Sequence, residues 1–490
     1  MCKSFVFALA ILLAQYVAGQ STLHVDAAGG APFTTIQGAI SVALPGDTIL
    51  VAPGVYDETV VISRSLTVRS TGGAAATQIL PTADGPAVRI VGSATTSLLE
   101  GFTITGHGQT MSVDSLPGGI LVAFGASAQI RRCVVKDCIG SSPIGSPFIF
   151  PTVTGGAGGM TVDSSASAII ENCLFLNNQG AAGVPGAGGP GGLLAAGTCD
   201  VRHCVFTGNT GGTATIALAP LKGGGGAIEI GPQGHITVSN SILRGNMGGT
   251  GNMGTFAEDE IEPPTVALFA TASVSHSDVE NALVPFVTVG PGVIDLAPSF
   301  VNPAMENYAL QAGSPCIDAG DCGATSPLGR DFLGNPRLRG FAPDMGAYEF
   351  LHDTTRMGTS EDILLTTVVN GNTADALVNT KSIGGGDSLV VHWESPCGSL
   401  DGAPYFLAAQ FYVPSMPPVP ILPALYLDMG GAAIVDGPAN LPPGGVTLTF
   451  SVPPGSFAPA ISRVQVLVIT PLSQAPFSVA TSDAQDLVFL

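Results

Sequence analysis

The apolar and polar positions of this chain follow one nine-residue phrase that recurs between Leu99 and Asn246. Each copy opens on a short apolar run and ends near Gly, Asn or Cys. The copies begin at Leu99, Ile130, Ile170, Val201 and Val238. Their fourth positions are Phe102, Cys133, Cys173, Cys204 and Ser241. Their ninth positions are His107, Cys138, Asn178, Asn209 and Asn246.

A second phrase, Gly-Gly followed by an apolar run, precedes the later copies. It begins at Gly118, Gly158, Gly191 and Gly225. Self-similarity at a period of roughly 20–50 residues is typical of solenoids and propellers. Because the units are short β runs with no helical pattern between them, the repeat predicts a parallel β-helix.

In such a coil, equivalent residues of successive coils stack about 4.8 Å apart. An inward ladder favours small or apolar side chains, so we expect the fourth positions to point into the helix. A turn ladder favours residues that tolerate left-handed backbone, and Asn is the usual choice after Gly. We therefore expect Asn178, Asn209 and Asn246 to form the turn.

Ahead of the repeat, the stretch from Phe33 to Leu44 places Ile36, Ala39, Ile40 and Ala43 on one helical face. Thr34 or Thr35 can cap this helix, and Pro45-Gly46 ends it. The open end of a solenoid needs a cover for its apolar core. The sequence thus predicts an N-terminal helical cap.

From about Thr354 the repeat is absent, and strands alternate with Pro/Gly turns. About 130 residues of this kind predict a small β-sandwich, with the lone Trp393 in its core. The expected fold is therefore all-β. We predict four parts: a signal peptide (1–19), a parallel β-helix (20–352), a linker (353–360) and a β-sandwich (361–490).

The stretch from Thr34 to Glu58 resembles the N-terminal cap of the pectin-lyase-like right-handed parallel β-helix superfamily. The repeat phrases resemble bacterial secreted or surface β-helix proteins related to polymorphic outer-membrane proteins. The phrases at 313–321, 330–337 and 344–349 resemble the segment that closes such helices. The resemblance covers about Ser21 to Phe350. It implies the fold, but it names no activity, because the superfamily holds lyases, hydrolases, esterases, tailspikes and adhesins.

Charged residues make up only 11% of the chain, and the formal net charge is −20. A surface of that sign disfavours nucleic acid and anionic lipid as partners. The basic start at Met1, the apolar run from Phe5 to Leu13 and the small residues Val17-Ala-Gly19 predict a secretory signal. We expect a secreted protein, extracellular or on the cell surface, without a membrane span.

Nine cysteines are present, and eight remain once Cys2 is removed with the signal. Cys133, Cys173 and Cys204 lie in the predicted inward ladder. They could form disulfides between coils or remain buried thiols, and the sequence leaves both open. Cys316 and Cys322 are predicted to form a loop disulfide, which an exported protein permits.

Catalytic chemistry of the superfamily was not found in the sequence. The candidate bases of a lyase are Arg131, Arg132, Lys136, Arg202 and Arg244. No acidic calcium cluster accompanies them, so solvated outer charges are the favoured interpretation. Gly106-His107-Gly108 matches one hydrolase signature without its partners, and the two Asp and one Arg of an esterase cannot be placed. The predicted catalytic set is empty.

Gly- and Pro-rich insertions follow the ninth-position turns and should emerge on one side, either as a binding wall or as tolerated loops. Asp318 and Asp321, with Asp331 and Asp344 nearby, are predicted to bind calcium, although Asp in such loops also forms turns. No other cofactor is expected.

The first functional hypothesis is a non-catalytic protein that presents a binding surface for glycans or other surface components. The alternative is a carbohydrate-active enzyme, a polysaccharide lyase or glycoside hydrolase. An enzyme would need several outward charged side chains that converge in one groove. The oligomeric state stays open.

Overall fold

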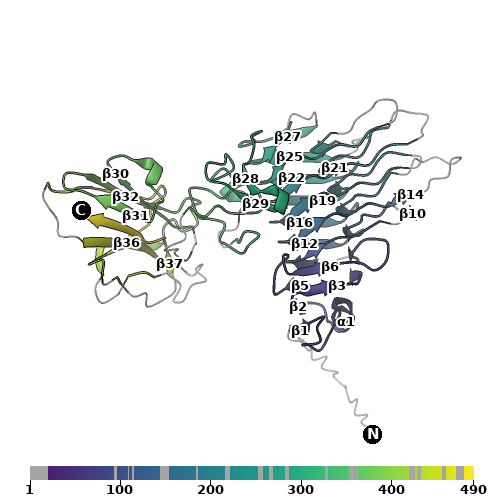
Figure 1. Ribbon diagram of the computed structural model, residues 1–490, viewed down its shortest axis with the longest axis horizontal. Coiled ribbons are helices and arrows are strands. Elements are labelled where there is room, and N and C mark those ends of the chain that lie inside the picture. Colours follow the sequence, from purple (N-terminus) through teal and green to yellow (C-terminus); the bar gives the residue numbers. More distant parts are fainter. Residues whose placement is uncertain are drawn as a thin grey trace, which may run out of the picture.

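The short apolar runs of the repeat pair in parallel, coil upon coil, in the computed structural model (Figure 1). The structure describes residues 20–489 except for 93–95, 109, 113–114, 144–153, 184–185, 216–220, 252–257, 264–268, 282–285, 326–328, 353–358, 360–361, 416, 419–424, 428–431, 455–459 and 471–478. The predicted signal peptide and most of the predicted linker therefore lie outside the described residues. The four-part division of the chain stays a prediction.

Three parallel sheets form the walls of the β-helix, and we call them sheets A, B and C. Within the described residues, sheet A contains β1 (Thr22–Val25), β2 (Thr48–Val51), β5 (Thr67–Ser70), β8 (Thr96–Glu100), β12 (Ser127–Arg131), β16 (Ser167–Glu171), β19 (Thr198–Arg202), β22 (His235–Ser239), β25 (Thr271–Ser275) and β27 (Val287–Val289).

Sheet B contains β3 (Gly54–Tyr56), β6 (Thr77–Ile79), β9 (Thr103–Ile104), β13 (Val134–Lys136), β17 (Leu174–Leu176), β20 (Val205–Thr207), β23 (Ile242–Leu243) and β26 (Asp278–Val279). Sheet C contains β4 (Val60–Ile62), β7 (Val88–Ile90), β11 (Ile120–Val122), β15 (Met160–Val162), β18 (Leu193–Ala195), β21 (Ile228–Ile230) and β24 (Ile261–Glu262). The Gly-Gly phrases thus lead into sheet C, and the nine-residue phrase runs from sheet A into sheet B.

The inward prediction for the fourth positions is confirmed, because all five side chains are fully buried. The cysteines among them are free thiols, which decides between the two alternatives left open above. Each thiol faces a carbonyl of its own turn, as Cys173 Sγ does with Glu171 O at 3.3 Å. Burial raises the pKa of the Cys133 and Cys173 thiols, so both are held in the neutral form.

The turn prediction for Asn178, Asn209 and Asn246 is wrong. Left-handed backbone occurs one residue earlier, as at Asn177 (φ 53°) and Gly208 (φ 69°). The ninth-position asparagines are buried instead, and they form an internal ladder. Asn178 Nδ2 donates to Val135 O at 3.0 Å and to Asn209 Oδ1 at 2.8 Å. The amide can satisfy backbone groups where the chain turns a corner, which explains an inward Asn there.

The N-terminal cap is confirmed as helix α1 (Ile36–Val42). Thr35 caps α1 by accepting from Gly38 N. Ile36, Ala39 and Ile40 are buried in the core of the β-helix. Figure 1 shows α1 beside β1 and β2 at the first coils. Within the described residues, no helix is long and apolar enough to cross a membrane.

The described parts of the insertions lie on one side of the β-helix, as predicted, where Figure 1 labels β10 (Thr110–Ser112) and β14 (Ser142–Pro143). These two strands pair with each other. Beyond the strands, glycine backbones stack from coil to coil, as where Gly212 N donates to Gly189 O at 2.8 Å. A Cβ at Gly212 would lie 2.0 Å from Ala181 O, so this close approach of two backbones requires glycine.

After the last coil, residues Phe300–Phe350 fold back along the outer face of sheet B, and we call them the closing segment. It contains β28 (Phe300–Asn302), the 3₁₀ helices η2 (Pro303–Met305) and η3 (Cys322–Ala324), and β29 (Asn307–Leu310), which is antiparallel to β28. Three buried corner side chains of the β-helix, Asn172, His203 and Asn240, bond to it. Asn240 Oδ1, for example, accepts from Asp321 N at 2.7 Å.

The C-terminal part is a β-sandwich, as predicted, with Trp393 fully buried in its core. Its strands pair antiparallel except for β31 and β38, which pair in parallel. It also contains the short 3₁₀ helix η4 (Thr373–Asp375). One sheet contains β30 (Leu364–Val369), β32 (Ser388–Glu394) and β35 (Val446–Ser451). The other contains β31 (Thr380–Ile383), β38 (Gln485–Phe489), β36 (Ala460–Ile469), β33 (Pro404–Tyr412) and β34 (Ala433–Asn440), with β37 (Val479–Thr481) paired to β36.

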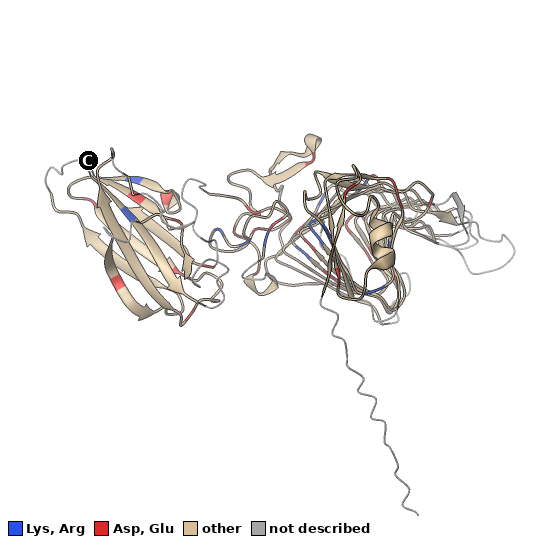
Figure 2. Ribbon diagram, turned by 90° about the horizontal axis from the view of Figure 1, so that it is seen from below, with Lys and Arg blue, Asp and Glu red and all other residues tan. Residues whose placement is uncertain are grey.

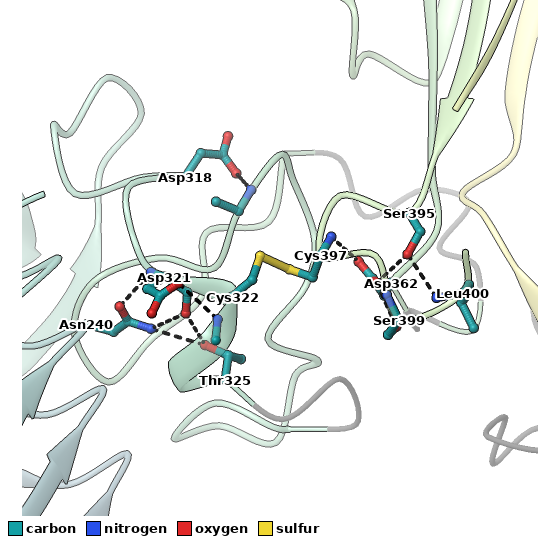
Figure 3. Close-up of a disulfide and its surroundings, with 12 residues drawn as sticks. Asn240, Asp318, Asp321, Cys322, Thr325, Asp362, Ser395, Cys397, Ser399 and Leu400 are labelled. Atoms are coloured by element: carbon teal, nitrogen blue, oxygen red, sulfur yellow. Dashed lines mark hydrogen bonds between the residues drawn. A yellow bond between two sulfur atoms is a disulfide. The ribbon is translucent and has the colours of Figure 1, made fainter. Parts of the chain in front are cut away.

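The predicted Cys316–Cys322 disulfide is wrong. Cys322 bonds to Cys397 of the sandwich, across a Cα–Cα distance of 5.4 Å, and Cys316 is a free thiol. Cys316 is fully buried between the closing segment and sheet B, whereas Cys322 faces the sandwich from η3 (Figure 3). On the far side, the Asp362 carboxylate fixes the loop by accepting from Cys397 N at 2.9 Å. The disulfide therefore joins the closing segment to the sandwich.

Candidate functional site

The outer face of sheet B changes from open to covered along the helix axis. One outward row carries, coil by coil, Val55, Gln78, Thr103, Val134, Leu174, Val205 and Ile242. Val55 is 53% exposed, Val134 is 8% exposed and Val205 is fully buried. The apolar members from Val134 onward pack beneath the closing segment, against residues such as Tyr308 and Tyr348. Over the first coils, the closing segment does not cover the outer face of sheet B.

An open cavity of about 600 Å³ lies where the open face meets the closing segment, and we call it the groove. This volume falls within the range of roughly 300–1,000 Å³ that is usual for ligand sites. Its lining comprises residues 54–55, 74–78, Thr103, Val134, Lys136, Leu174, Leu176, 305–307, 332–333 and Tyr348. Sheet B supplies the floor, and the closing segment supplies a wall.

The wall carries apolar side chains that are partly exposed, beside Glu306 and Asn307. Met305 is 77% exposed and Leu333 is 68% exposed. Behind them, the Phe332 and Tyr348 rings pack with their centroids 5.3 Å apart. Apolar side chains held open to solvent by a folded framework are typical of a surface that binds a ligand.

One ion pair crosses the groove. Lys136 Nζ lies 2.7 and 2.8 Å from the two carboxylate oxygens of Glu306, although 170 residues separate the two in sequence. The remaining polar side chains on the floor are neutral. Gln78 Nε2 reaches Thr105 Oγ1 at 3.5 Å, and Thr103 Oγ1 donates to Ala74 O at 2.8 Å. The positive charge of Lys136 is therefore balanced by the carboxylate of Glu306.

The candidate bases named from the sequence do not converge. Arg131 and Arg202 belong to sheet A, where they face Glu171 and Asp200. Along that face, one outward row alternates in charge, running Arg69, Glu100, Arg131, Glu171 and Arg202. Figure 2 shows blue and red segments beside one another along one flank of the β-helix. The second position of the repeated phrase carries this alternation, so the sequence contained a signal for it.

Arg244 brings two Asp and one Arg together, which is the set that the sequence could not place. Its guanidinium bonds to both oxygens of Asp278, at 3.0 and 3.2 Å, and also to Asp295. The Asp278 side chain is fully buried, and it also accepts from Leu296 N. Both oxygens of Asp278 are bonded and its side chain is buried, so this carboxylate serves to hold the last coils together, whereas the Asp295 side chain is 49% exposed.

Two glutamates stack on neighbouring coils of sheet C. Glu229 of β21 pairs in register with Glu262 of β24. Lys222 Nζ lies 3.0 Å from Glu262 Oε1, and Glu258 N donates to its other oxygen. Burial, together with the charge of Glu262, raises the pKa of Glu229 to about 8. One of the two carboxyl groups is therefore protonated at neutral pH.

The predicted calcium ligands lie in turns of the closing segment and lie apart in Figure 3. Asp318 Oδ1 accepts from Ala342 N at 3.3 Å, and Asp321 Oδ1 accepts from Gly323 N at 3.0 Å. In the part of the chain that the structure describes, no group of three or more His, Cys, Asp or Glu side chains could hold a metal ion. The calcium site stays a prediction.

The family comparison agrees with the fold. A family model described as a right handed beta helix region matches residues 84–281. No curated protein matches the chain. Among solved structures, a pectin methylesterase from Aspergillus niger is 12% identical, with a TM-score of 0.33 over 56% of this chain and 82% of that one. Pectin methylesterase PemA from Erwinia chrysanthemi is also 12% identical, with a TM-score of 0.26 over 56% and 92%. Likenesses of this size identify neither a shared activity nor a shared site.

Proposed function

We propose that this protein is a secreted or cell-surface protein that binds glycans without cleaving them, and that the groove on sheet B is its binding site. One observation carries the proposal. The open cavity of about 600 Å³ combines exposed apolar side chains on its wall with neutral polar side chains on its floor.

A sugar ring presents apolar C–H groups on its faces and hydroxyl groups around its edge. Leu333 and Met305 can contact the faces, while the amide of Gln78 and the hydroxyl of Thr103 can bond to the edge. These two polar side chains lie on adjacent coils, about 4.8 Å apart. The lining therefore complements a saccharide better than a fully apolar ligand.

The charge of the groove favours an uncharged glycan. Lys136 is paired with Glu306, so a uronate would have to displace a carboxylate that is already bound. The chain as a whole, at −20, also repels a polyanion at long range. We expect no cleavage of pectate, alginate or chondroitin, measured as ultraviolet absorbance of the unsaturated product.

A glycan array followed by titration calorimetry of the full chain tests the proposal. In the Gln78→Ala variant, loss of one hydrogen bond should weaken binding by about 1 kcal/mol, or roughly fivefold. Leu333→Ala should weaken it by a similar factor. Phe124 is 68% exposed but does not line the groove, so Phe124→Ala is the matched control and should leave affinity unchanged. Absence of binding to any glycan, or equal affinity in all variants, would contradict the proposal.

A second candidate, a glycoside hydrolase, is favoured by the Glu229–Glu262 stack. Retaining hydrolases use two carboxyl groups about 5–5.5 Å apart, one of them protonated, and adjacent coils supply a spacing of that order. The Glu262 side chain is only 5% exposed and is held by Lys222, which disfavours attack on a substrate. Hydrolysis of neutral glucans or xylans that is lost in Glu229→Gln would support this candidate over the binding function.

A further inference from the structure

The two charged side chains of the groove occupy each other. Among the described residues that line it, Lys136 is the one cation and Glu306 is the one anion. Lys136 ends β13 on the floor, and Glu306 follows η2 on the wall. The ammonium donates to both carboxylate oxygens, at 2.7 and 2.8 Å. The place that an acidic ligand would take on this floor is therefore filled by a carboxylate of the chain itself.

The hairpin of β28 and β29 carries Glu306 to the floor. Its base is fixed, because Tyr308 is buried and its ring packs edge-on against Phe300, with the centroids 5.1 Å apart. Its tip, residues 301–307, is exposed. Glu306 has left-handed backbone, with φ at 57°, which is uncommon for a residue other than glycine and persists only where the surroundings support it. The ion pair with Lys136 supplies one such support, so this side chain is held toward the sheet although the tip around it faces solvent.

Neutral hydrogen-bonding side chains lie beside the ammonium on the floor. Thr103 pairs in register with Val134, two residues before Lys136, and Gln78 pairs with Thr103 on the next coil. Both polar side chains are half-buried, and successive coils are about 4.8 Å apart. A cation next to neutral polar groups at this spacing suits an acidic sugar, which presents one carboxylate together with several hydroxyl groups. Glu306 blocks this use of the floor by occupying the cation.

We propose that Lys136 is a carboxylate subsite of the groove and that Glu306 occupies it in place of an acidic sugar, which makes Glu306 the residue that selects uncharged glycans. This inference rests on the proposed function of the same site. Two effects oppose a uronate: it must displace a tethered carboxylate, and the displaced Glu306 stays beside it as a like charge. An exposed ion pair and an exposed like charge at about 4 Å each correspond to a factor of up to about five, hence about 25-fold together.

Two probes that share one sugar backbone and differ in charge test this inference: hexagalacturonate and its hexamethyl ester, titrated into the full chain by calorimetry. The measured quantity is the ratio of the affinity for the ester to the affinity for the acid. Glu306→Gln keeps the shape of the side chain and removes its charge, so this ratio should fall about 25-fold. Adding Lys136→Met to that variant should remove most of the gain for the acid. Glu171→Gln is the matched control, because it frees Arg131 on sheet A and changes the net charge equally, and it should leave the ratio unchanged.

The other outcomes separate this inference from the proposed function. If the unaltered chain binds the ester and Glu306→Gln leaves the ratio unchanged, the inference is wrong while glycan binding stands. An equal fall in Glu171→Gln would also overturn the inference, because the effect would then come from net charge. If the unaltered chain binds neither the ester nor any neutral glycan of the array, whereas Glu306→Gln binds hexagalacturonate, the carboxylate subsite stands and the proposed function fails. Absence of binding in every variant would overturn both.

Discussion

The outer faces of sheets A and B belong to the same coils, yet they serve different purposes. On sheet A, one outward row alternates Arg and Glu, and Arg69 pairs with Glu100 and Arg131 with Glu171. On sheet B, the outward row from Val134 to Ile242 is apolar and lies beneath the closing segment. The difference shows that one repeat can build a solvated wall and a docking surface side by side. The groove lies where the outer face of sheet B extends beyond the closing segment.

Both faces depend on the shared interior, so breaking the interior should have the largest effect. Cys173→Arg places an unpaired charge at a fully buried position and should abolish folding and secretion. Cys173→Ser is the matched control. Ser241 already fills the same ladder, with its hydroxyl bonded to Ser239 O at 2.8 Å, as Cys173 Sγ faces Glu171 O. A folded, secreted Cys173→Arg protein would refute the ladder.

An isoleucine on each face compares the two faces directly. Ile242 points outward on sheet B and is 1% exposed beneath the closing segment, whereas Ile169 points outward on sheet A and is half-buried. Ile242→Ala should lower the free energy of unfolding by about 2–5 kcal/mol, through lost contacts and a cavity. Ile169→Ala should lower it by less than about 1 kcal/mol. Chemical denaturation measures both, and equal losses would contradict the distinction between the faces.

The Cys322–Cys397 disulfide joins the closing segment, which covers sheet B, to the sandwich. The Cys322→Ser/Cys397→Ser variant should lower the free energy of unfolding by about 2–4 kcal/mol, since the cross-link restricts the unfolded chain. Peptide mapping under oxidising conditions should recover the two cysteines in one linked pair, with Cys316 free. A Cys316–Cys322 link in that map would restore the pairing expected from sequence.

Sheet C, unlike sheets A and B, should make the free energy of unfolding depend on pH through Glu229. The pKa of Glu229 is raised to about 8, against about 4.5 in the unfolded chain, so the folded state keeps a proton that the unfolded state loses. The stabilising contribution of protonated Glu229 should therefore be fully present below about pH 4.5. It should decline as the pH rises toward 8. Glu229→Gln should flatten this decline in a series of denaturation curves. An unchanged slope would contradict burial of the carboxyl group.

The repeat made the β-helix readable from the sequence, because ladders depend on positions that recur. Inward Cys133 and Cys173 could be predicted in this way. Asn178 could not, since Asn suits a left-handed turn and a buried amide ladder equally well. The alternation of Glu100 and Arg131 was present in the aligned phrases, but it becomes an ion-pair row only once the register is known.

The groove could not be predicted, because half of it comes from outside the repeat. Lys136 and Glu306 are 170 residues apart, and Leu333 has no counterpart in any coil. Cys322 and Cys397 are likewise joined by the docking of two parts of the chain rather than by spacing. Sequence patterns describe what recurs, whereas this site arises where a segment that occurs once covers part of a repeated surface.

Hydrogen–deuterium exchange of the full chain, with and without a glycan identified on the array, tests the central claim most directly. The account predicts slower exchange in β3, β6 and β9 and in the Phe332–Leu333 turn, no change along the outer face of sheet A, and recovery of the glycan intact. Protection centred on sheet A or on the Glu229–Glu262 stack, or a glycan recovered in fragments, would contradict it.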